Sequence, residues 1–579
     1  MNVRVSGGME LFETNRLMLI YIELAFVVAL AFAAVTFSGF ASESLARTEA
    51  LFSLLARRRG LALLMVGGLA IAMRLAALPI LPIPRPSIDD EFSYLLQADT
   101  YLHGRLTNPT PPMWIHLETF HINMRPTYQS KYPPAQGIVL ATGKLIAGYP
   151  IVGVWLSMAA MCVAICWMLQ EWISPEWAMA GALILAVRLS VFSYWGNSYW
   201  GGALPATGGA LLLGGLVRLR KSPRVRDSLL MGLGIAILAS SRPYEGLLLC
   251  IPASVALLFW WLKEKKTEFF LVMRRTVFPL VLCVGVTAIA MGYYNWRVTG
   301  HPLRLPYQLN EMTYEVAPLF IFQSPRPQPL YNHDALREFY LLSDLPQYQQ
   351  TQSVRGLLLS WYQRTEKVWL LLLGPALTLP LLVALLIRAR ELKWKRLDWR
   401  GRFLVWTSAV SIAGLAIEVY GQAHYAAPMT CVLMAIVLLA MRRMRRWEWH
   451  GKPAGLFLSR AIPLTCVLML ALRAAAGPLH IDTGPTWPPT WYNSDSRKLP
   501  RDGIEKGLEK VPGKSLVLVS YKAQGNSDTP HEWIYNAADI DSAKIVWAWD
   551  MGAAKNQELI DYFNDRQVWK IEVSEIPSR

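Results

Sequence analysis

The sequence predicts a multi-pass, all-α transmembrane bundle with a small α/β domain at its C-terminal end. Three observations predict this class. The 579-residue chain is 53% hydrophobic, and several of its apolar runs approach the length that crosses a bilayer. Its net charge of +16 comes from Lys and Arg that cluster mostly in short loops between those runs, as the positive-inside rule describes. Beyond residue 499 the apolar runs give way to short, strand-like segments.

The apolar runs predict about twelve transmembrane helices. A helix needs about 20 mainly apolar residues to cross the hydrocarbon core, and several of these runs are shorter than that. The predicted spans are 17–37, 61–78, 152–169, 177–192, 204–217, 229–240, 246–261, 277–291, 368–387, 403–419, 426–441 and 461–476.

The basic clusters predict the topology, because cytoplasmic loops carry an excess of Lys and Arg. The loop 170–176, with two acids and no base, gives this topology no support. The predicted location is the inner (plasma) membrane, with the loop after Asp89, the segment 293–366 and the C-terminal tail on the extracytoplasmic side. The clusters are 57–59, 218–226, 263–266, 388–402 and 442–446.

These boundaries divide the chain into three predicted parts. Residues 1–60 form an N-terminal extra transmembrane helix and a cytoplasmic loop. Residues 61–477 form the transmembrane domain, with outer loops 81–150 and 293–366. Residues 478–579 form the small extracytoplasmic domain, in which 515–520, 544–549 and 567–573 are the predicted strands and 556–564 a helix.

Three consecutive acids, Asp89, Asp90 and Glu91, lie where the chain leaves the span 61–78. Acids are costly so close to lipid, so their presence suggests a function. The apolar residues that follow are spaced like one face of a helix, which predicts a short amphipathic helix on the membrane surface. The alternative is an ordinary helix start, where acids favour the positive end of the helix dipole.

Charged residues also lie within or at the edges of apolar runs, all toward the outer face under this topology. A set of bases at one membrane face would suit a lipid phosphate, whereas each Arg alone could extend to the headgroups. Arg242 is the strongest candidate, because the segment 240–246 interrupts a hydrophobic region. The charged residues in or beside the apolar runs are Arg74, Arg188, Arg242, Glu245, Glu418 and Arg473.

The outer loop 111–134 is rich in Pro and aromatic residues, which favours a fixed, irregular loop at the interface. Within it, His116, Glu118 and His121 could be ligands of a divalent cation, although their spacing is a weak signal. No cofactor is predicted with certainty.

Several short motifs resemble the membrane-embedded C-type superfamily of glycosyltransferases. Within it, they are most similar to family 39-like enzymes, which include protein O-mannosyltransferases and the lipid A aminoarabinose transferase. The resemblance covers roughly residues 61–441; the extra first span and the compact tail depart from the pattern. The motifs are Asp90-Glu91, Ser130-Lys131-Tyr132-Pro133-Pro134, Arg242-Pro243, Asn295 with Thr299-Gly300-His301-Pro302, and His424-Tyr425 with Pro428.

This resemblance implies an enzyme that moves a sugar from a polyprenyl-phosphate donor to a lipid, glycan or protein acceptor, with inversion at the anomeric carbon. Its partners would be those substrates and membrane lipids, not nucleic acid. A carboxylate with its pKa raised by a partly apolar site could take the acceptor's proton. Asp90 is the predicted base, Asp89 the second candidate, and Glu91 would orient the base or hold a cation.

Basic side chains would stabilise the departing phosphate through charge-assisted hydrogen bonds. Arg242 and Lys131 are the predicted phosphate ligands. The remaining predicted substrate-binding residues are Tyr132, His121, Tyr244, Glu245, His424 and Tyr425.

Two other classes of function use the same spans. A transporter or lipid flippase would need a site near the midplane, discontinuous helices and internal repeats, and no convincing repeat is seen. A non-catalytic sensor would bind an envelope ligand through its tail.

Overall fold

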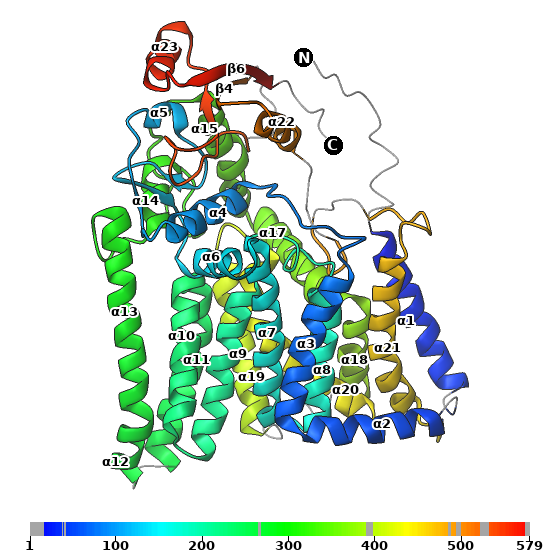
Figure 1. The fold of residues 1–579 in the computed structure, drawn as a ribbon. Helices are drawn as coiled ribbons and strands as arrows, with labels where there is room; N and C mark the ends of the chain where they lie inside the picture. The colour runs from blue at the N-terminus through cyan, green and yellow to red at the C-terminus, as the bar shows by residue number, and fades with distance from the viewer. Residues whose placement is uncertain are drawn as a thin grey trace.

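The computed structural model describes residues 17–37, 39, 42–264, 268–388, 398–483, 488–493, 499–521 and 532–573. Long helices run side by side and form a single bundle (Figure 1). The bundle helices are α1 (Met18–Thr36), α3 (Arg59–Ala76), α7 (Pro150–Trp172), α8 (Pro175–Leu189), α9 (Ala203–Lys221), α10 (Val225–Ser241), α11 (Pro243–Glu264), α13 (Phe278–Thr299), α18 (Gly374–Arg388), α19 (Trp399–Ala416), α20 (Thr430–Met444) and α21 (Ala454–Ala474).

Each predicted span overlaps one of these helices. Within the described residues, eight segments are long and apolar enough to cross a membrane. The others are shorter, less apolar or more charged, as α9 is with three basic residues in its last turn. The predicted class, a multi-pass helical membrane protein with a small α/β region, is confirmed.

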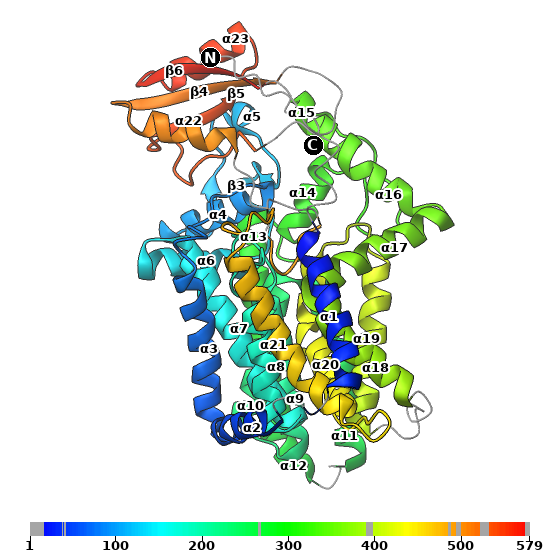
Figure 2. The ribbon, with the colours of Figure 1, turned by 90° about the vertical axis from the view of Figure 1, so that its right-hand side faces the viewer.

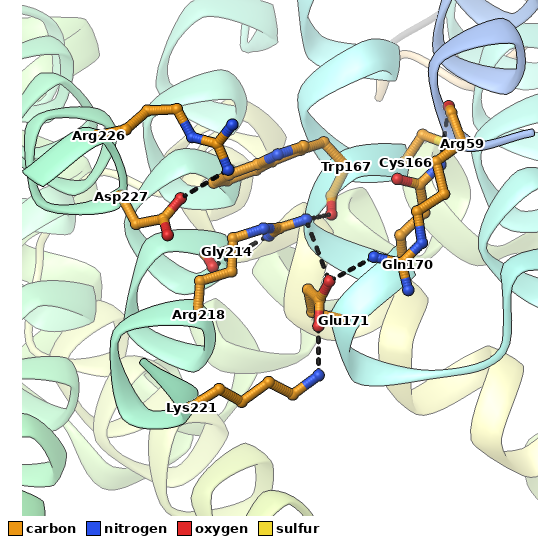
Figure 3. A network of polar contacts seen from close by, with 10 residues as sticks. All are labelled: Arg59, Cys166, Trp167, Gln170, Glu171, Gly214, Arg218, Lys221, Arg226 and Asp227. Atoms are coloured by element: carbon orange, nitrogen blue, oxygen red, sulfur yellow. Dashed lines mark hydrogen bonds and ion pairs between the residues drawn. The ribbon is translucent and has the colours of Figure 1, made fainter. Parts of the chain in front are cut away.

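One end of the bundle, here called the α2 end, carries the amphipathic helix α2 (Ser42–Arg57) across it (Figure 1). At this end the Glu171 carboxylate accepts a hydrogen bond from Arg59 at 2.7 Å and also forms an ion pair with Lys221 (Figure 3). The Arg218 guanidinium lies over the ring of Trp167. Residues from two predicted basic clusters thus converge on one carboxylate. The acid that seemed to break the topology pattern is their counter-ion.

The opposite end, here called the α4 end, carries α4 (Asp89–Leu102) and α6 (Ala135–Ala147) across the bundle (Figure 1). A three-stranded sheet in the order β1-β3-β2 follows α4 in sequence. The segment 293–366, predicted only as a long outer loop, is mostly helical. The remaining elements before the C-terminal domain are β1 (Asn108–Pro109), α5 (Trp114–Leu117), β2 (Ile122–Asn123), β3 (Thr127–Ser130), α12 (Phe269–Val272), η2 (Met273–Val277), α14 (Pro306–Tyr314), α15 (Asp334–Glu338), η3 (Phe339–Asp344), α16 (Leu345–Thr351), α17 (Val354–Val368), η4 (Trp369–Leu373) and η7 (Ala423–Met429).

The C-terminal domain has the predicted strands, here as a parallel sheet in the order β5-β4-β6. It lies beyond α4, and α14 to α16 lie on the other side of the same end (Figure 2). Its elements are α22 (Pro500–Glu509), β4 (Lys514–Tyr521), β5 (Ile545–Trp549), α23 (Ala553–Tyr562) and β6 (Arg566–Val573).

Helix α4 is covered on both faces, which differs from the predicted surface helix. Phe92 and Leu96 join a core with strand residues of the C-terminal domain, whereas Tyr94 and Ala98 pack on α6 and α7. Gly137 of α6 has no Cβ, and one would lie 2.4 Å from Gln97 Oε1. That close approach lets the two helices pack, and α4 is therefore held between bundle and domain.

A buried ion pair fixes the extra helix α1 to the bundle. Arg188 donates to Glu23 at 3.0 Å, and both side chains are fully buried. Trp491 Nε1 donates to the other oxygen of Glu23 at 2.9 Å, and Arg188 also donates to the Leu373 carbonyl at 2.7 Å. Because Arg188 binds both the Glu23 carboxylate and the Leu373 carbonyl, the pair is a structural connection between α1, α8 and η4.

Candidate active site

The Asp90 carboxylate is the centre of a compact polar group at the N-terminus of α4. His121 Nδ1 lies 2.6 Å from Asp90 Oδ1, and the Tyr132 hydroxyl donates to the same oxygen. Both side chains of the acid–imidazole pair are partly accessible, Asp90 at 19% and His121 at 15%. The structure thus brings together three of the predicted site residues, from α4 and from the loops on either side of β2 and β3.

The electrostatic setting of Asp90 differs from the expectation of a raised pKa. Burial by itself raises the pKa of this carboxyl. The charge of His121 and the hydrogen bonds from His121 and Tyr132 outweigh burial, and the pKa of Asp90 lies well below its usual range. His121 was predicted as a substrate-binding residue in the outer loop, whereas the structure pairs its imidazole directly with this acid.

The backbone of His121 is held in an unusual conformation. Its φ is +57°, a region that costs a non-glycine residue about 1–3 kcal/mol, although histidine tolerates it better than most. The His121 carbonyl accepts from Ser93 Oγ at 2.7 Å and from the backbone N–H of Lys131 at 3.1 Å. These bonds to α4 and to the end of β3 stabilise the loop and aim the imidazole at Asp90.

Glu91 points away from Asp90 and binds backbone. One carboxylate oxygen accepts from Ser87 N at 2.6 Å and from Ser87 Oγ, and the other accepts from Tyr199 N at 2.9 Å. Burial raises the pKa of Glu91 to about 7 despite these donors. The contacts join the start of α4 to the segment between α8 and α9, which positions Asp90 indirectly.

Asp89 faces the C-terminal domain. The Tyr535 hydroxyl donates to Asp89 Oδ1 at 2.6 Å, and the Tyr535 ring stacks on Phe92 with centroids 4.4 Å apart. Nearby, the Ala538 backbone N–H donates to Asp99 at 2.7 Å. The C-terminal domain therefore contacts α4 at Asp89, one residue before Asp90. No sequence signal linked Asp89 to Tyr535, because these positions are far apart in the chain.

Lys131 lies between the base and two further acids. Its ammonium is 3.5 Å from Glu315, a buried residue that follows α14. Burial and the charge of Glu315 raise the pKa of Asp344 well above its ordinary value, while Lys131 opposes that shift. Glu315 and Asp344 were not predicted from the sequence, because only tertiary packing brings them near Lys131.

Arg242 is the single residue between α10, which ends at Ser241, and α11, which begins at Pro243. Its guanidinium is 3.5 Å from Glu245 and 4.7 Å from the centre of the Tyr425 ring. A small cavity beside it reaches α4 and α6. The cavity is lined by Tyr94, Pro133, Gln136, Gly201, Pro205, Ser241 and Arg242.

Aromatic contacts connect this cavity to Asp90. Tyr94 stacks on Tyr132 with centroids 4.4 Å apart, and Tyr132 donates to Asp90. Tyr94 therefore belongs to the site, although the sequence marked it only as an apolar face residue. The path runs from Arg242 past Tyr94 and Tyr132 to the Asp90 carboxylate.

The remaining predicted substrate-binding residues make different contacts. His424 is buried; its Nδ1 is 3.1 Å from the Tyr194 hydroxyl, and its ring packs edge-on against Trp200. Tyr244 directs its hydroxyl to the Gly414 carbonyl at 2.9 Å. Tyr425 meets Arg242, whereas Tyr244 supports α19.

The predicted set of phosphate-binding bases is not gathered at one place. Arg74 donates to the Leu81 carbonyl at 3.0 Å, Arg473 to the Tyr492 carbonyl at 2.8 Å, and Arg188 belongs to the α1 ion pair. These three side chains satisfy carbonyls or an acid within the fold. Of the predicted arginines, Arg242 is the one that lines the cavity next to α4.

The three suggested metal ligands are also separate. His116 contacts the Lys555 carbonyl at 3.1 Å, Glu118 accepts from Tyr314 at 2.8 Å, and His121 pairs with Asp90. Across the described ranges, no group of three or more His, Cys, Asp or Glu side chains is arranged to hold a metal ion. Loop geometry directs each of these three side chains to a different partner.

No family model matches the chain, and no curated protein matches it either. Among solved structures, the chain is similar to the apo oligosaccharyltransferase of Archaeoglobus fulgidus, with a TM-score of 0.42 and 12% identity over 79% of this chain and 62% of that chain. It is also similar to ArnT from Cupriavidus metallidurans bound to undecaprenyl phosphate, with a TM-score of 0.41 and 10% identity over 88% of this chain and 89% of that chain. The chain thus spans less than two thirds of the archaeal enzyme.

Proposed function

We propose that the chain is an integral membrane glycosyltransferase that moves a sugar from a polyprenyl-phosphate donor to an acceptor hydroxyl, with inversion. The observation that supports it best is the placement of Asp90. This partly accessible carboxylate lies at the α4 end and is joined through Tyr132 and Tyr94 to the cavity beside Arg242. In this proposal, the base and the phosphate ligand lie at the same face of the bundle and are connected by Tyr132 and Tyr94. The α4 end is proposed to face the extracytoplasmic side of the plasma membrane.

The chemistry follows from these groups. Asp90 takes the proton of the acceptor hydroxyl while the acceptor oxygen bonds to the anomeric carbon. The bond from that carbon to the phosphate oxygen breaks, and its electron pair leaves with the polyprenyl phosphate. Arg242 and Lys131 would stabilise the negative charge on the leaving phosphate. Attack opposite the leaving group inverts the anomeric centre.

The α4 acids provide a matched test. Asp90→Asn keeps an oxygen to accept from His121 and Tyr132 but cannot accept the acceptor's proton. We expect release of polyprenyl phosphate to fall roughly 100- to 10,000-fold, with binding of polyprenyl phosphate retained. The assay uses purified protein in detergent, polyprenyl-phosphate hexoses and pentoses as donors, and lipid, glycan and peptide acceptors.

Asp89→Asn is the control, because Asp89 also accepts a tyrosine hydroxyl, whereas the His121 imidazole lies against Asp90. We expect a milder loss from it. Near-normal transfer by Asp90→Asn would remove Asp90 as the base, and loss from Asp89→Asn alone would move the role to that residue.

A further inference from the structure

The Asp90–His121 pair controls more than the orientation of the base. We propose that His121 sets the base strength of Asp90, so that sugar transfer requires His121 to be neutral. The proposal rests on the proposed transferase function, and it assigns His121 a positioning and tuning role through Asp90 in place of the substrate contact expected from the sequence. Its basis is the 2.6 Å approach of Nδ1 to Asp90 Oδ1.

The geometry fixes which nitrogen acts. Nδ1 faces the carboxylate, so a neutral imidazole that bonds Asp90 carries its proton on Nδ1. Asp90 Oδ1 then accepts from both His121 and Tyr132, and Oδ2 remains for the acceptor's proton. The His121 backbone has a positive φ, and its carbonyl accepts two hydrogen bonds. Together these features hold the imidazole ring in this position.

A second proton on His121 would change the chemistry in two ways. The imidazolium stabilises the carboxylate form of Asp90, and a carboxylate that holds protons weakly is a poor base near neutral pH. It also places a positive charge next to an anomeric centre that becomes oxocarbenium-like as the donor bond breaks. The neutral imidazole keeps the orienting hydrogen bond without either penalty.

Other ionisable groups near the pair must be considered. Lys131 also lowers the pKa of Asp90, but Glu315 lies 3.5 Å from its ammonium. Asp344 lies in η3, the helix whose Phe339 ring packs edge-on against His121 at 5.8 Å, and the pKa of that acid is raised. Tyr132 has its pKa raised by burial and by Asp90. Glu91, next to Asp90, has its pKa raised to about 7 by burial, but its carboxylate accepts from Tyr199 N and points away from the pair. The His121→Asn variant therefore separates the contribution of the imidazole from that of Glu91.

The chain offers a close comparison on the same helix. His103 Nδ1 lies 3.6 Å from Asp99, but both side chains are well exposed, at 46% and 36%. Solvent screens such a pair, so it should have little effect on either partner. His121→Asn is the test variant, because asparagine tolerates a positive φ and its amide nitrogen occupies the place of Nδ1 without gaining charge.

The first experiment needs no substrate. In full-length protein labelled at histidine carbons, the signal of His121 is identified as the one lost in His121→Asn. We expect its titration to move to lower pH in Asp90→Asn, because the anionic partner is gone. An unchanged titration would overturn the pair as an electrostatic unit.

The second experiment measures release of polyprenyl phosphate from polyprenyl-phosphate hexoses and pentoses against pH. We expect kcat/KM of the wild type to fall about tenfold per pH unit on the acid side. His121→Asn should abolish this limb, and His103→Asn should keep it. A limb that persists in His121→Asn would refute the proposal. If no polyprenyl phosphate were released at any pH but the His121 titration still shifted in Asp90→Asn, the transferase function would be rejected. The Asp90–His121 pair would then remain as an electrostatic unit.

Discussion

The ion pair between Arg242 and Glu245 allows donor binding to be separated from folding. The guanidinium and carboxylate are 3.5 Å apart, with side-chain exposures of 17% and 8%. Replacing Arg242 alone leaves a buried acid without its counter-ion. We therefore compare Arg242→Gln with the double variant Arg242→Gln/Glu245→Gln, which removes both charges and keeps both side chains long and polar.

The magnitudes follow from burial. Breaking a buried pair by removing one partner costs about 3–5 kcal/mol, whereas removing both charges is often close to neutral. Loss of the cation–π contact with Tyr425, at 4.7 Å, adds about 0.5–2 kcal/mol to both variants. A charge-assisted hydrogen bond to phosphate contributes roughly 1.5–3 kcal/mol, which corresponds to about 10- to 150-fold in Kd.

The assay combines thermal unfolding in detergent with the Kd for polyprenyl phosphate. Arg242→Gln should lower both stability and affinity, and the double variant should regain most of the stability while its affinity stays weak. Arg242→Lys should restore affinity only in part, since a point charge replaces a planar fork. Wild-type affinity in the stable double variant would show that Arg242 serves Glu245 and not the donor.

Two predictions concern the residues that hold the site and the bundle together. Burial raises the pKa of Glu91 from 4.5 to about 7, so this acid disfavours the folded state increasingly as pH rises through that interval, by about 3 kcal/mol in full. Thermal unfolding of Glu91→Gln should show a flatter pH dependence between about pH 5 and 8, and an identical slope would contradict the assignment. Glu23→Gln should lower the free energy of unfolding by about 3–5 kcal/mol, because Arg188 stays buried without its acid. The exposed α2 acid in Glu43→Gln is the control, and equal melting temperatures would argue against a role for the pair.

The α4 end shows how much of the candidate active site could be predicted from local sequence. Asp90 and Arg242 were candidates from their positions beside apolar runs. His121 was a candidate from the outer loop, and Lys131 and Tyr132 were candidates from a short motif. The structure joins Asp90 directly to Tyr132 and His121. What the sequence could not provide was the pairing itself, because an Asp–His contact across 31 positions depends on a loop conformation with a positive φ.

The bundle and the C-terminal domain were predictable because their signals are local. Apolar run length, basic clusters and alternating strands depend on neighbours in sequence, and these patterns follow from the solvent that each segment meets. The sequence alone thus determined the class of protein, the extra helix α1 and the strands of the tail, whereas their parallel pairing came from the structure.

Tertiary structure alone decided which polar groups meet. The Tyr535 hydroxyl on Asp89, the backbone donors on Glu91 and the bases around Glu171 join segments that are far apart in the chain. A buried polar group must find a partner wherever packing places one, and burial, not spacing, sets its pKa and its cost. The sequence therefore determined which residues were candidates, and only the packing of α4 between bundle and domain decided which of them surround the proposed base.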